Sequence, residues 1–224
     1  IVELWVRLRK RGYTRTIESL WRVMRREGWL AKAEKKKPYK PKPYEQMQYP
    51  GQRVQIDVKF VPKACIVNQQ ESTQWFQYTF LDEYSRFRYI EAFQEHSTYS
   101  STAFLRHVVK KFPYLIECVQ TDNGTEFTNR LLPKGSDKPT LFELELKKLG
   151  IRHKLIRPYT PRHNGKVERS HRKDNEEFYA SHRFYSFDDF KAQLAVRERA
   201  YNNFPMRPLS WRSPKQVLFA FLNL

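Results

Sequence analysis

One stretch near the middle of the chain strongly limits how it can fold. Over residues 53–60, aliphatic and aromatic side chains alternate with polar ones, and one of the polar residues is Asp57. Period-two alternation sends successive side chains to opposite faces of a β-strand. We therefore predict a strand here that buries its apolar side chains and presents Asp57 on the opposite face.

The segments that follow continue this pattern in a definite order. We expect strands at 75–81 and 87–93, a helix capped by Ser97, a strand at 116–120, a helix at 141–149 ended by Gly150, and a strand at 151–156. Three meandering strands followed by alternating helices and strands describe one known topology. The fold class predicted is α/β, a ribonuclease H-like mixed five-stranded sheet flanked by helices.

Three acidic residues are expected to meet in this sheet. Asp122 follows the 116–120 strand and opens the turn Asp122-Asn-Gly124, while Glu168 lies in the helical stretch 161–173. The first and fourth strands of such a sheet are neighbours, so Asp57 and Asp122 can approach each other, and Glu168 would reach them from the helix laid across them. Carboxylate oxygens suit hard divalent cations, which stabilise phosphoryl transfer.

Asp82 is a competing candidate, because it also ends a strand and a single exposed acid is weak evidence for a metal ligand. We interpret Asp82 as a turn-former beside Ser85 and Arg86.

The positive charge is unevenly distributed. The net charge of +18 divides into +9 for residues 1–50, +1 for 51–150 and +8 for 151–224. A near-neutral middle between two basic ends suggests a folded core flanked by regions that contact nucleic acid. A Lys-rich surface that only maintains solubility is the alternative.

The N-terminal region has the pattern of two short helices. Apolar residues recur at helical spacing before Gly12, and Thr16 is placed to cap a second helix that ends at Gly28. In the second helix Leu20, Val23 and Met24 are expected inward, and Arg22, Arg25 and Arg26 outward. Residues 1–33 therefore fit a partial helix-turn-helix DNA-binding segment. An amphipathic helix pair packed on the main domain is the alternative.

Residues 34–50 are a basic, Pro-rich linker that includes Lys35, Lys36 and Lys37. Four prolines disfavour regular structure, and alternating Lys and Tyr suit a phosphate backbone, although an inert spacer fits equally well.

Several other features bound the class of protein. Cys65 and Cys118 stand alone in apolar contexts and are expected in the core, with no structural zinc. No apolar run reaches the ~18 residues of a membrane span, and no signal peptide is apparent, so we expect a cytoplasmic, DNA-associated protein. The chain begins without Met in a helical pattern, which suggests part of a longer protein.

Two motifs carry a family resemblance. Thr121-Asp-Asn-Gly-Thr-Glu-Phe127 and Arg157-Pro-Tyr-Thr-Pro-Arg-His-Asn-Gly-Lys-Val-Glu-Arg169 resemble the core of the retroviral-integrase superfamily. More closely, the chain is similar to bacterial insertion-sequence transposases with a DDE triad. Residues 1–33 resemble the helix-turn-helix segment that precedes their core. The resemblance implies a catalytic core at 51–204 and a C-terminal tail at 205–224.

The resemblance also implies chemistry and partners. It places a metal-binding catalytic triad on Asp57, Asp122 and Glu168, with Mg²⁺ as cofactor, Mn²⁺ able to substitute and no nucleotide cofactor. The implied reactions are cleavage of transposon ends and strand transfer into target DNA by a homodimer or larger assembly, with no membrane involved. Between Asp122 and Glu168 lie 45 residues. The family more often has about 35, and we place the excess in the Pro/Gly loop at 130–140, where lengthening costs little.

Several residues near the triad are expected to contact DNA. Lys166, Arg169, Arg172 and Lys173 would hold the backbone, and Asn123 and Asn164 would help to place it. Apolar residues at helical spacing over 187–204 are a candidate assembly contact, or simply a helix packed on its own core. Two alternative functions stay open: another ribonuclease H-like nuclease, and a non-catalytic DNA-binding derivative of a transposase.

Overall fold

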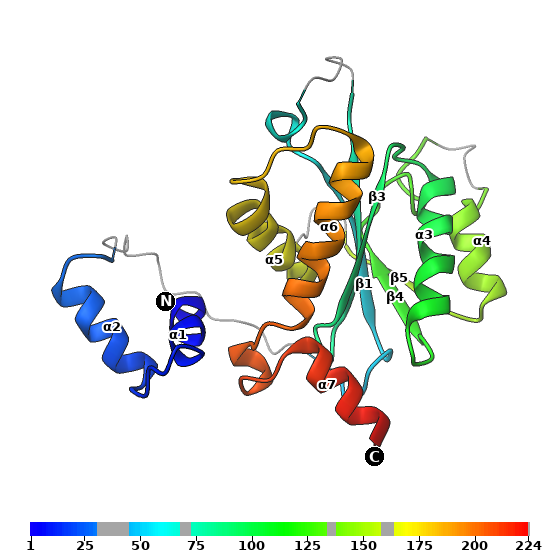
Figure 1. The fold of residues 1–224 in the computed structure, drawn as a ribbon. Coiled ribbons are helices and arrows are strands. Elements are labelled where there is room, and N and C mark those ends of the chain that lie inside the picture. The colour runs from blue at the N-terminus through cyan, green and yellow to red at the C-terminus, as the bar shows by residue number, and fades with distance from the viewer. Residues whose placement is uncertain (31–44, 68–72, 134–137, 158–163, 224) are drawn as a thin grey trace.

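The computed structural model describes residues 1–30, 45–67, 73–133, 138–157 and 164–223. Its centre is a five-stranded sheet with the strand order β3-β2-β1-β4-β5 (Figure 1). The strands are β1 Val54–Phe60, β2 Phe76–Asp82, β3 Arg88–Phe93, β4 Cys118–Thr121 and β5 Arg152–Leu155. β1, β2 and β3 form an antiparallel meander, whereas β4 and β5 run parallel to β1. This confirms the predicted mixed sheet and the neighbouring first and fourth strands.

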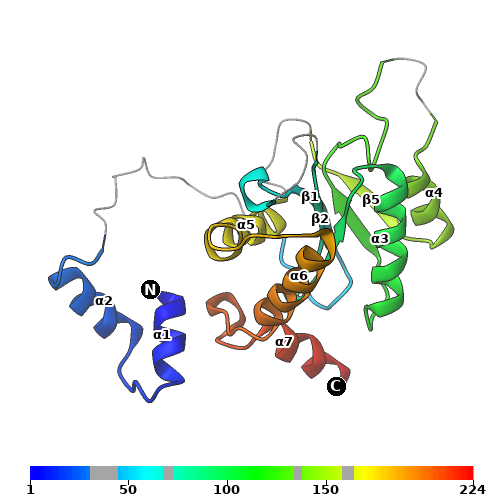
Figure 2. The same ribbon diagram turned by 45° about the horizontal axis from the view of Figure 1, so that its top comes forward.

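Helices cover both faces of the sheet. α3 (Thr98–Lys111) and α4 (Leu141–Lys148) lie on one side, and α5 (Gly165–Asp174) and α6 (Phe187–Asn202) lie on the other (Figures 1 and 2). The Ser97 side chain accepts a hydrogen bond from the Ser100 backbone at the start of α3, as predicted. Thr140 forms a capping box with Glu143 at the start of α4, which accounts for a helix directly after the Pro/Gly loop.

The two faces of the sheet differ in polarity. Under α3 and α4 the core is apolar, with Ile56, Phe80 and Phe104 fully buried. Under α6 a second apolar cluster gathers around Phe184 and Phe190. The strand surface that faces α5, in contrast, is polar, and this patch carries the candidate site.

The N-terminal region forms two helices, α1 (Val2–Arg9) and α2 (Ile17–Arg26), as predicted. Thr16 caps α2 by accepting from the Ser19 backbone. Leu20 is buried, but Val23 is 40% exposed rather than inward. α1 packs on the C-terminal part of the chain, where the Trp5 and Trp211 ring centroids lie 4.7 Å apart. DNA binding by this pair stays a prediction.

The end of the predicted linker lies on the core. Met47 and Pro50 are buried, and the Tyr49 hydroxyl lies 2.8 Å from a carboxylate oxygen of Glu117. Lys35, Lys36 and Lys37 fall outside the described residues.

The predicted C-terminal tail also packs on the core rather than standing apart. Leu218, in α7 (Pro214–Ala220), is buried in the main apolar cluster, and its carbonyl accepts from the Tyr114 hydroxyl at 2.6 Å. The boundary predicted at residue 204 stays a prediction.

One face of α6 packs on the protein's own core, which was the simpler of the two interpretations of residues 187–204. Phe190 and Leu194 are buried in their own core, whereas Val196 is 56% exposed. Cys65 and Cys118 are buried free cysteines, as predicted. None of the described helices is long and apolar enough to cross a membrane.

Candidate active site

The three predicted acids come from three elements that meet at one edge of the sheet. In the parallel pairing of β1 and β4, Gln55 stands opposite Gln120, so Asp57 and Asp122 lie two residues further along each chain segment. Glu168 lies on α5, which packs on β1 and β2. The topology thus brings together residues that are far apart in sequence.

The acids repel one another. Burial raises the pKa of the Asp122 carboxyl to about 6, the charge of Asp57 adds to the rise, and the Gly124 N–H opposes it. Burial likewise raises the pKa of Glu168, and the charges of Asp57 and Asp122 contribute. Each shift has a neighbouring acid among its causes, so the three carboxylates form one electrostatic site.

The donor set suits a hard cation, although the carboxylates are not tightly gathered. Among the described residues, no group of three or more His, Cys, Asp or Glu side chains is arranged to hold a metal ion. A divalent cation would relieve the repulsion between Asp57, Asp122 and Glu168, and carboxylate oxygens are the ligands it prefers. These residues would hold it, once drawn closer than they lie here.

A histidine missed by sequence reasoning contacts the first acid. His171 Nδ1 lies 3.4 Å from Asp57 Oδ2, and His171 Nε2 lies 2.9 Å from the Thr79 hydroxyl. Thr79 is directly opposite Asp57 in the β1–β2 ladder. The spacing in the sequence could have indicated His171, because it follows Glu168 by three residues and so lies on the same side of the helix.

A second contact between a histidine and an acid lies beside Asp122. His96 Nε2 lies 2.8 Å from Glu126 Oε1, and this contact raises the pKa of His96 against the effect of burial. A Cβ atom at Gly124 would come within 2.4 Å of the Glu126 carboxylate. Gly124 therefore lets a further buried acid sit over the turn that carries Asp122. Glu126 lies within the Thr121–Phe127 motif, but no separate signal marked it.

The two asparagines predicted to contact DNA make hydrogen bonds within the fold. Asn123 Nδ2 donates to the Ile156 carbonyl at 3.0 Å, which joins the Asp122 turn to the end of β5. Asn164, only 2% exposed, accepts from Gln120 at 3.1 Å. Their contact with DNA stays a prediction.

Asp82 is a turn-former, as predicted. Its carboxylate accepts from the Gly51 N–H at 2.9 Å and from the Ser85 N–H and hydroxyl at 2.8 and 2.6 Å.

A cleft of about 650 Å³, lined by apolar residues together with several basic ones, lies on another side of α5. Lys166, Arg169 and Lys173 line it, opposite the start of α1 and the loop at 204–208. Lys166 is half-buried and paired with Glu83 at 2.8 Å, and Lys173 is paired with Glu177 at 3.1 Å. Arg169 is exposed.

The remaining predicted DNA contacts are on the surface. Arg172 is exposed and pairs with Glu176 at 2.9 Å. Arg22, Arg25 and Arg26 are exposed on α2. The structure thus leaves Arg169 and Arg172 open to a ligand, while Lys166 is held inward by a buried acid.

The strand order and the flanking helices define a ribonuclease H-like α/β core. The family described as Integrase core domain matches residues 48–161, just over half of the chain, and a second family of the same description matches residues 149–214. The chain belongs to the integrase core domain family.

Individual relatives agree with this assignment. "Putative integrase ORF3" of Spiroplasma virus SpV1-C74 is 31% identical over 125 residues, which span 53% of this chain and 33% of that protein. The chain thus matches about a third of its relative's length.

Solved structures show the same fold. A chain of the simian T-cell lymphotropic virus intasome in complex with PP2A regulatory subunit B56 gamma has a TM-score of 0.58 at 18% identity, over 78% of this chain and 56% of that one. The HTLV-2 integrase catalytic core domain in complex with magnesium has a TM-score of 0.54 at 14% identity, over 75% and 97%. The predicted retroviral-integrase-type core is confirmed, and the insertion-sequence setting stays a prediction.

Proposed function

We propose that this protein is a DDE transposase that cleaves the ends of a mobile DNA element and joins them to target DNA in a Mg²⁺-dependent reaction. One observation carries the proposal. In an integrase core fold, Asp57, Asp122 and Glu168 come from three elements, and burial together with the charge of Asp57 raises the pKa of both Asp122 and Glu168. Such a cluster of carboxylates lowers the stability of a protein without bound metal, whereas a metal-dependent enzyme uses it to hold its cations.

The chain's own residues provide positioning and charge. Asp57, Asp122 and Glu168 would hold the cations, and Gly124 gives Asp122 a backbone N–H at 3.0 Å that orients its carboxylate. When bound, two divalent cations would stabilise the attacking and leaving oxygens of a phosphodiester. Because one phosphodiester is exchanged for another in strand transfer, no nucleotide cofactor is needed.

The distribution of basic side chains supports DNA as the partner. Arg169 and Arg172 extend from the same helix as Glu168, and both are exposed. The cleft beside α5 adds Lys173 and Arg207, and the outward arginines of α2 extend the basic surface. Phosphate contacts of this kind hold the backbone without reading its sequence.

We also propose a dimer or larger complex on DNA. Two element ends must be joined to one target, so at least two active sites have to be held together. Light scattering of the protein on paired-end DNA tests this, and a monomer in that complex would exclude it.

The triad is tested by single substitutions. The substrates are labelled duplexes carrying the inverted repeats that flank the encoding gene, both uncut and pre-cut. Asp57→Ala, Asp122→Ala and Glu168→Ala should each abolish cleavage and strand transfer in Mg²⁺ and in Mn²⁺, while DNA binding survives. Asp188→Ala is the matched control, because this acid is 90% exposed on α6 and should be silent.

The same assays separate the alternatives. Cleavage without strand transfer of pre-cut ends would indicate a different ribonuclease H-like nuclease. DNA binding with neither reaction in the unsubstituted protein would indicate a non-catalytic derivative. Near-normal strand transfer by Glu168→Ala would show that the triad assignment is wrong.

A further inference from the structure

The helix that carries Glu168 buries few apolar residues of its own. Helices on a sheet normally bury an apolar stripe. In α5, Val167 is the only apolar residue, and the other buried residues are Ser170, His171 and Asp174. The N-cap residue Asn164 makes no side-chain capping hydrogen bond. Apolar packing holds the π-helical turn Asn175–Tyr179 that continues α5, through Phe178 and Tyr179, but within α5 itself polar contacts predominate.

The sheet surface beneath α5 is correspondingly polar. Gln55, Gln77 and Thr79 are fully buried on the strands that face this helix. Gln55 accepts from the Val167 backbone N–H at 2.9 Å, and Gln77 donates to Asp174 at 3.0 Å. Hydrogen bonds are directional, whereas apolar contacts allow sliding and rotation. This interface thus specifies both the rotation and the axial position of α5.

A buried acid holds the start of α5. Glu83, in the turn after β2, accepts from Lys166 at 2.8 Å and from Gln55 at 3.0 Å. Arg53 also pairs with Glu83, at 2.8 Å. The first turn of the helix is thereby tied to β1 and to the β2–β3 turn.

A stronger contact holds the end of α5. Both carboxylate oxygens of Asp174 accept from Arg88, at 2.8 and 2.9 Å, and both side chains are fully buried. Arg197 of α6 adds a third ionic contact at 2.9 Å. Burial alone would raise the pKa of Asp174, but the charge of Arg88, with that of Arg197, holds it well below its usual range. The acid is therefore ionised and bonded in a fixed geometry.

Glu168 lies between these two attachments. It is two residues after Lys166 and six before Asp174, which corresponds to roughly 3 Å and 9 Å along the helix axis. A small slide or rotation of α5 would move its carboxylate relative to Asp57 and Asp122.

We propose that Asp174, held by Arg88 and Arg197, is a positioning residue that fixes the Glu168 carboxylate for metal binding without itself touching metal or DNA. This role rests on the proposed function, because it assigns Glu168 to the metal. A buried ion pair is a weak source of stability but a good source of a defined arrangement. That property suits a helix whose task is to present one carboxylate.

The test is Asp174→Asn in the full chain. The substitution keeps the shape of the side chain and removes the charge that compensates two arginines. Misplacing a reacting group by about 1 Å can cost roughly 100-fold in rate, so turnover in strand transfer should fall by about that factor. The Mn²⁺ concentration that gives half of the maximal melting-temperature rise should increase, while affinity for duplex DNA should not change.

Leu146→Ala is the control for a purely structural loss. Leu146 is a buried residue of α4, on the opposite face of the sheet from α5, so shortening its side chain destabilises the core without changing a contact of α5. Below both melting transitions, Leu146→Ala should keep normal turnover and the normal Mn²⁺ requirement.

Arg197→Gln removes only one partner of Asp174 and is the second variant should Asp174→Asn not fold. It should shift the Mn²⁺ requirement in the same direction by a smaller factor.

The outcomes separate this role from the proposed function. If the unsubstituted protein shows a Mn²⁺-dependent rise in melting temperature and the folded variants share its midpoint and turnover, the positioning role is wrong and the function stands. If the unsubstituted protein shows neither metal-dependent stabilisation nor strand transfer, the proposed function fails, and the positioning role fails with it.

Discussion

At the scale of single residues, the site is marked by a carboxylate that the fold disfavours in its charged form. Asp122 sits at the end of β4 beside Asp57 and Glu126, and its pKa is raised to about 6. A group whose pKa is higher in the folded state begins to lower stability as the pH passes its unfolded pKa, and the loss is complete above its folded pKa. The metal-free protein is thus destabilised at neutral pH by the Asp122 carboxylate of the candidate site.

Asp122→Asn should therefore stabilise the metal-free protein at neutral pH. Asparagine keeps the shape and carries no charge, so the gain should be absent below about pH 4, develop between pH 4 and 6, and be complete above about 6. Melting curves in EDTA across this range check it. Mg²⁺ should raise the melting temperature of the unsubstituted protein but not that of the variant. A variant that melts lower at pH 7.5 would contradict this account.

Arg172 provides a second prediction at this scale. It stands one helical turn beyond Glu168, and its pairing with Glu176 is exposed and thus worth at most ~1 kcal/mol, which leaves it free to contact DNA. Arg172→Ala should depress cleavage far more than it weakens DNA binding. Arg183→Ala, an exposed arginine away from α5, should change neither. Unchanged turnover with much weaker binding would show that Arg172 does not face the reacting phosphate.

The sequence marked the three candidate acids, whose catalytic role stays a prediction, but it did not mark the residues that hold them in place. Asp57 and Asp122 were found because each ends or lines a strand, and Glu168 because it is the one acid in a basic stretch. Glu83 and Asp174 resemble ordinary surface acids in the sequence. Their importance appears only when Lys166, Arg88 and Arg197 meet them across long sequence separations.

At the scale of elements, the meander and the helix caps were predictable because their signals are local. Alternation marked β1, β2 and β3 to within a residue or two, and Ser97 and Thr16 marked two helix starts. The π-helical turn at Asn175–Tyr179 was not foreseen, because nothing in its composition distinguishes it from α-helix. The packing of α7 on the core depends on tertiary contacts that sequence pattern does not report.

Gly51, which leads into β1, offers a test at this scale. Its φ is +83°, and an added Cβ would lie 2.1 Å from the Leu115 carbonyl oxygen. Gly51→Ala should therefore lower the free energy of unfolding by about 1–3 kcal/mol more than a glycine change that meets no neighbour. Gly150→Ala is the matched control, because its φ is also positive, at +69°, with no atom within 4 Å of the added Cβ. Urea denaturation measures both, and equal destabilisation would show that the loop at Leu115 moves aside.

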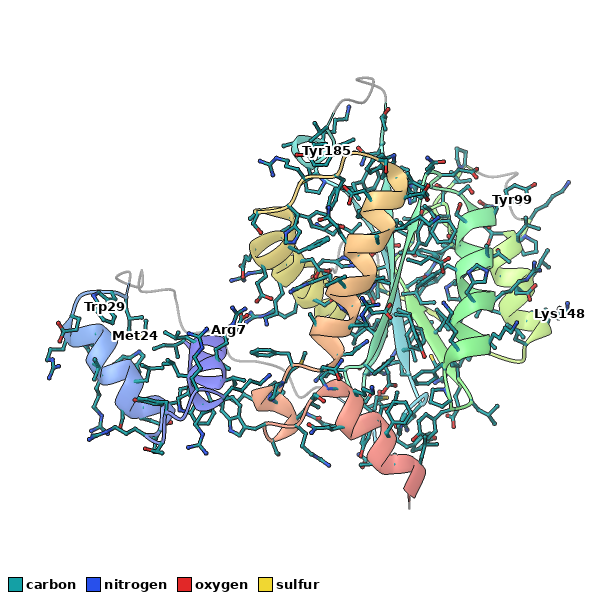
Figure 3. All side chains as sticks on the ribbon, viewed as in Figure 1. Arg7, Met24, Trp29, Tyr99, Lys148 and Tyr185 are labelled. Carbon is teal, nitrogen blue, oxygen red and sulfur yellow. The ribbon has the colours of Figure 1, made fainter. Side chains whose placement is uncertain are left out.

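At the scale of the whole molecule, basic side chains lie on both sides, but only one side faces the candidate site. Figure 3 shows Arg7 on α1 and Lys148 on α4 at opposite sides of the sheet. The α1 side adjoins the cleft beside α5, whereas the α4 side lies behind the apolar face. DNA held at the carboxylates should therefore extend toward α1 and α2.

Salt dependence can test this direction. Replacing Arg22, Arg25 and Arg26 of α2 with Gln should weaken binding to a duplex and flatten the dependence of log affinity on log salt by about 0.9 for each phosphate that is no longer neutralised. The control replaces Arg106, Lys147 and Lys148, which are also exposed, on α3 and α4. It removes the same charge and should leave the slope nearly unchanged. Equal flattening by both triple variants would indicate that the net charge, rather than the α2 surface, governs binding.

The ion pair between α5 and α6 also bears on when the protein becomes competent during its synthesis. Asp57 and Asp122 precede Asp174 and its partner Arg197 in the chain, so they are synthesised first. A nascent chain on the ribosome thus carries the basic helix α2 before the helix bearing Glu168 is secured. On the proposed function, a prematurely terminated chain would bind DNA without cutting it, and would compete with finished copies for the same ends.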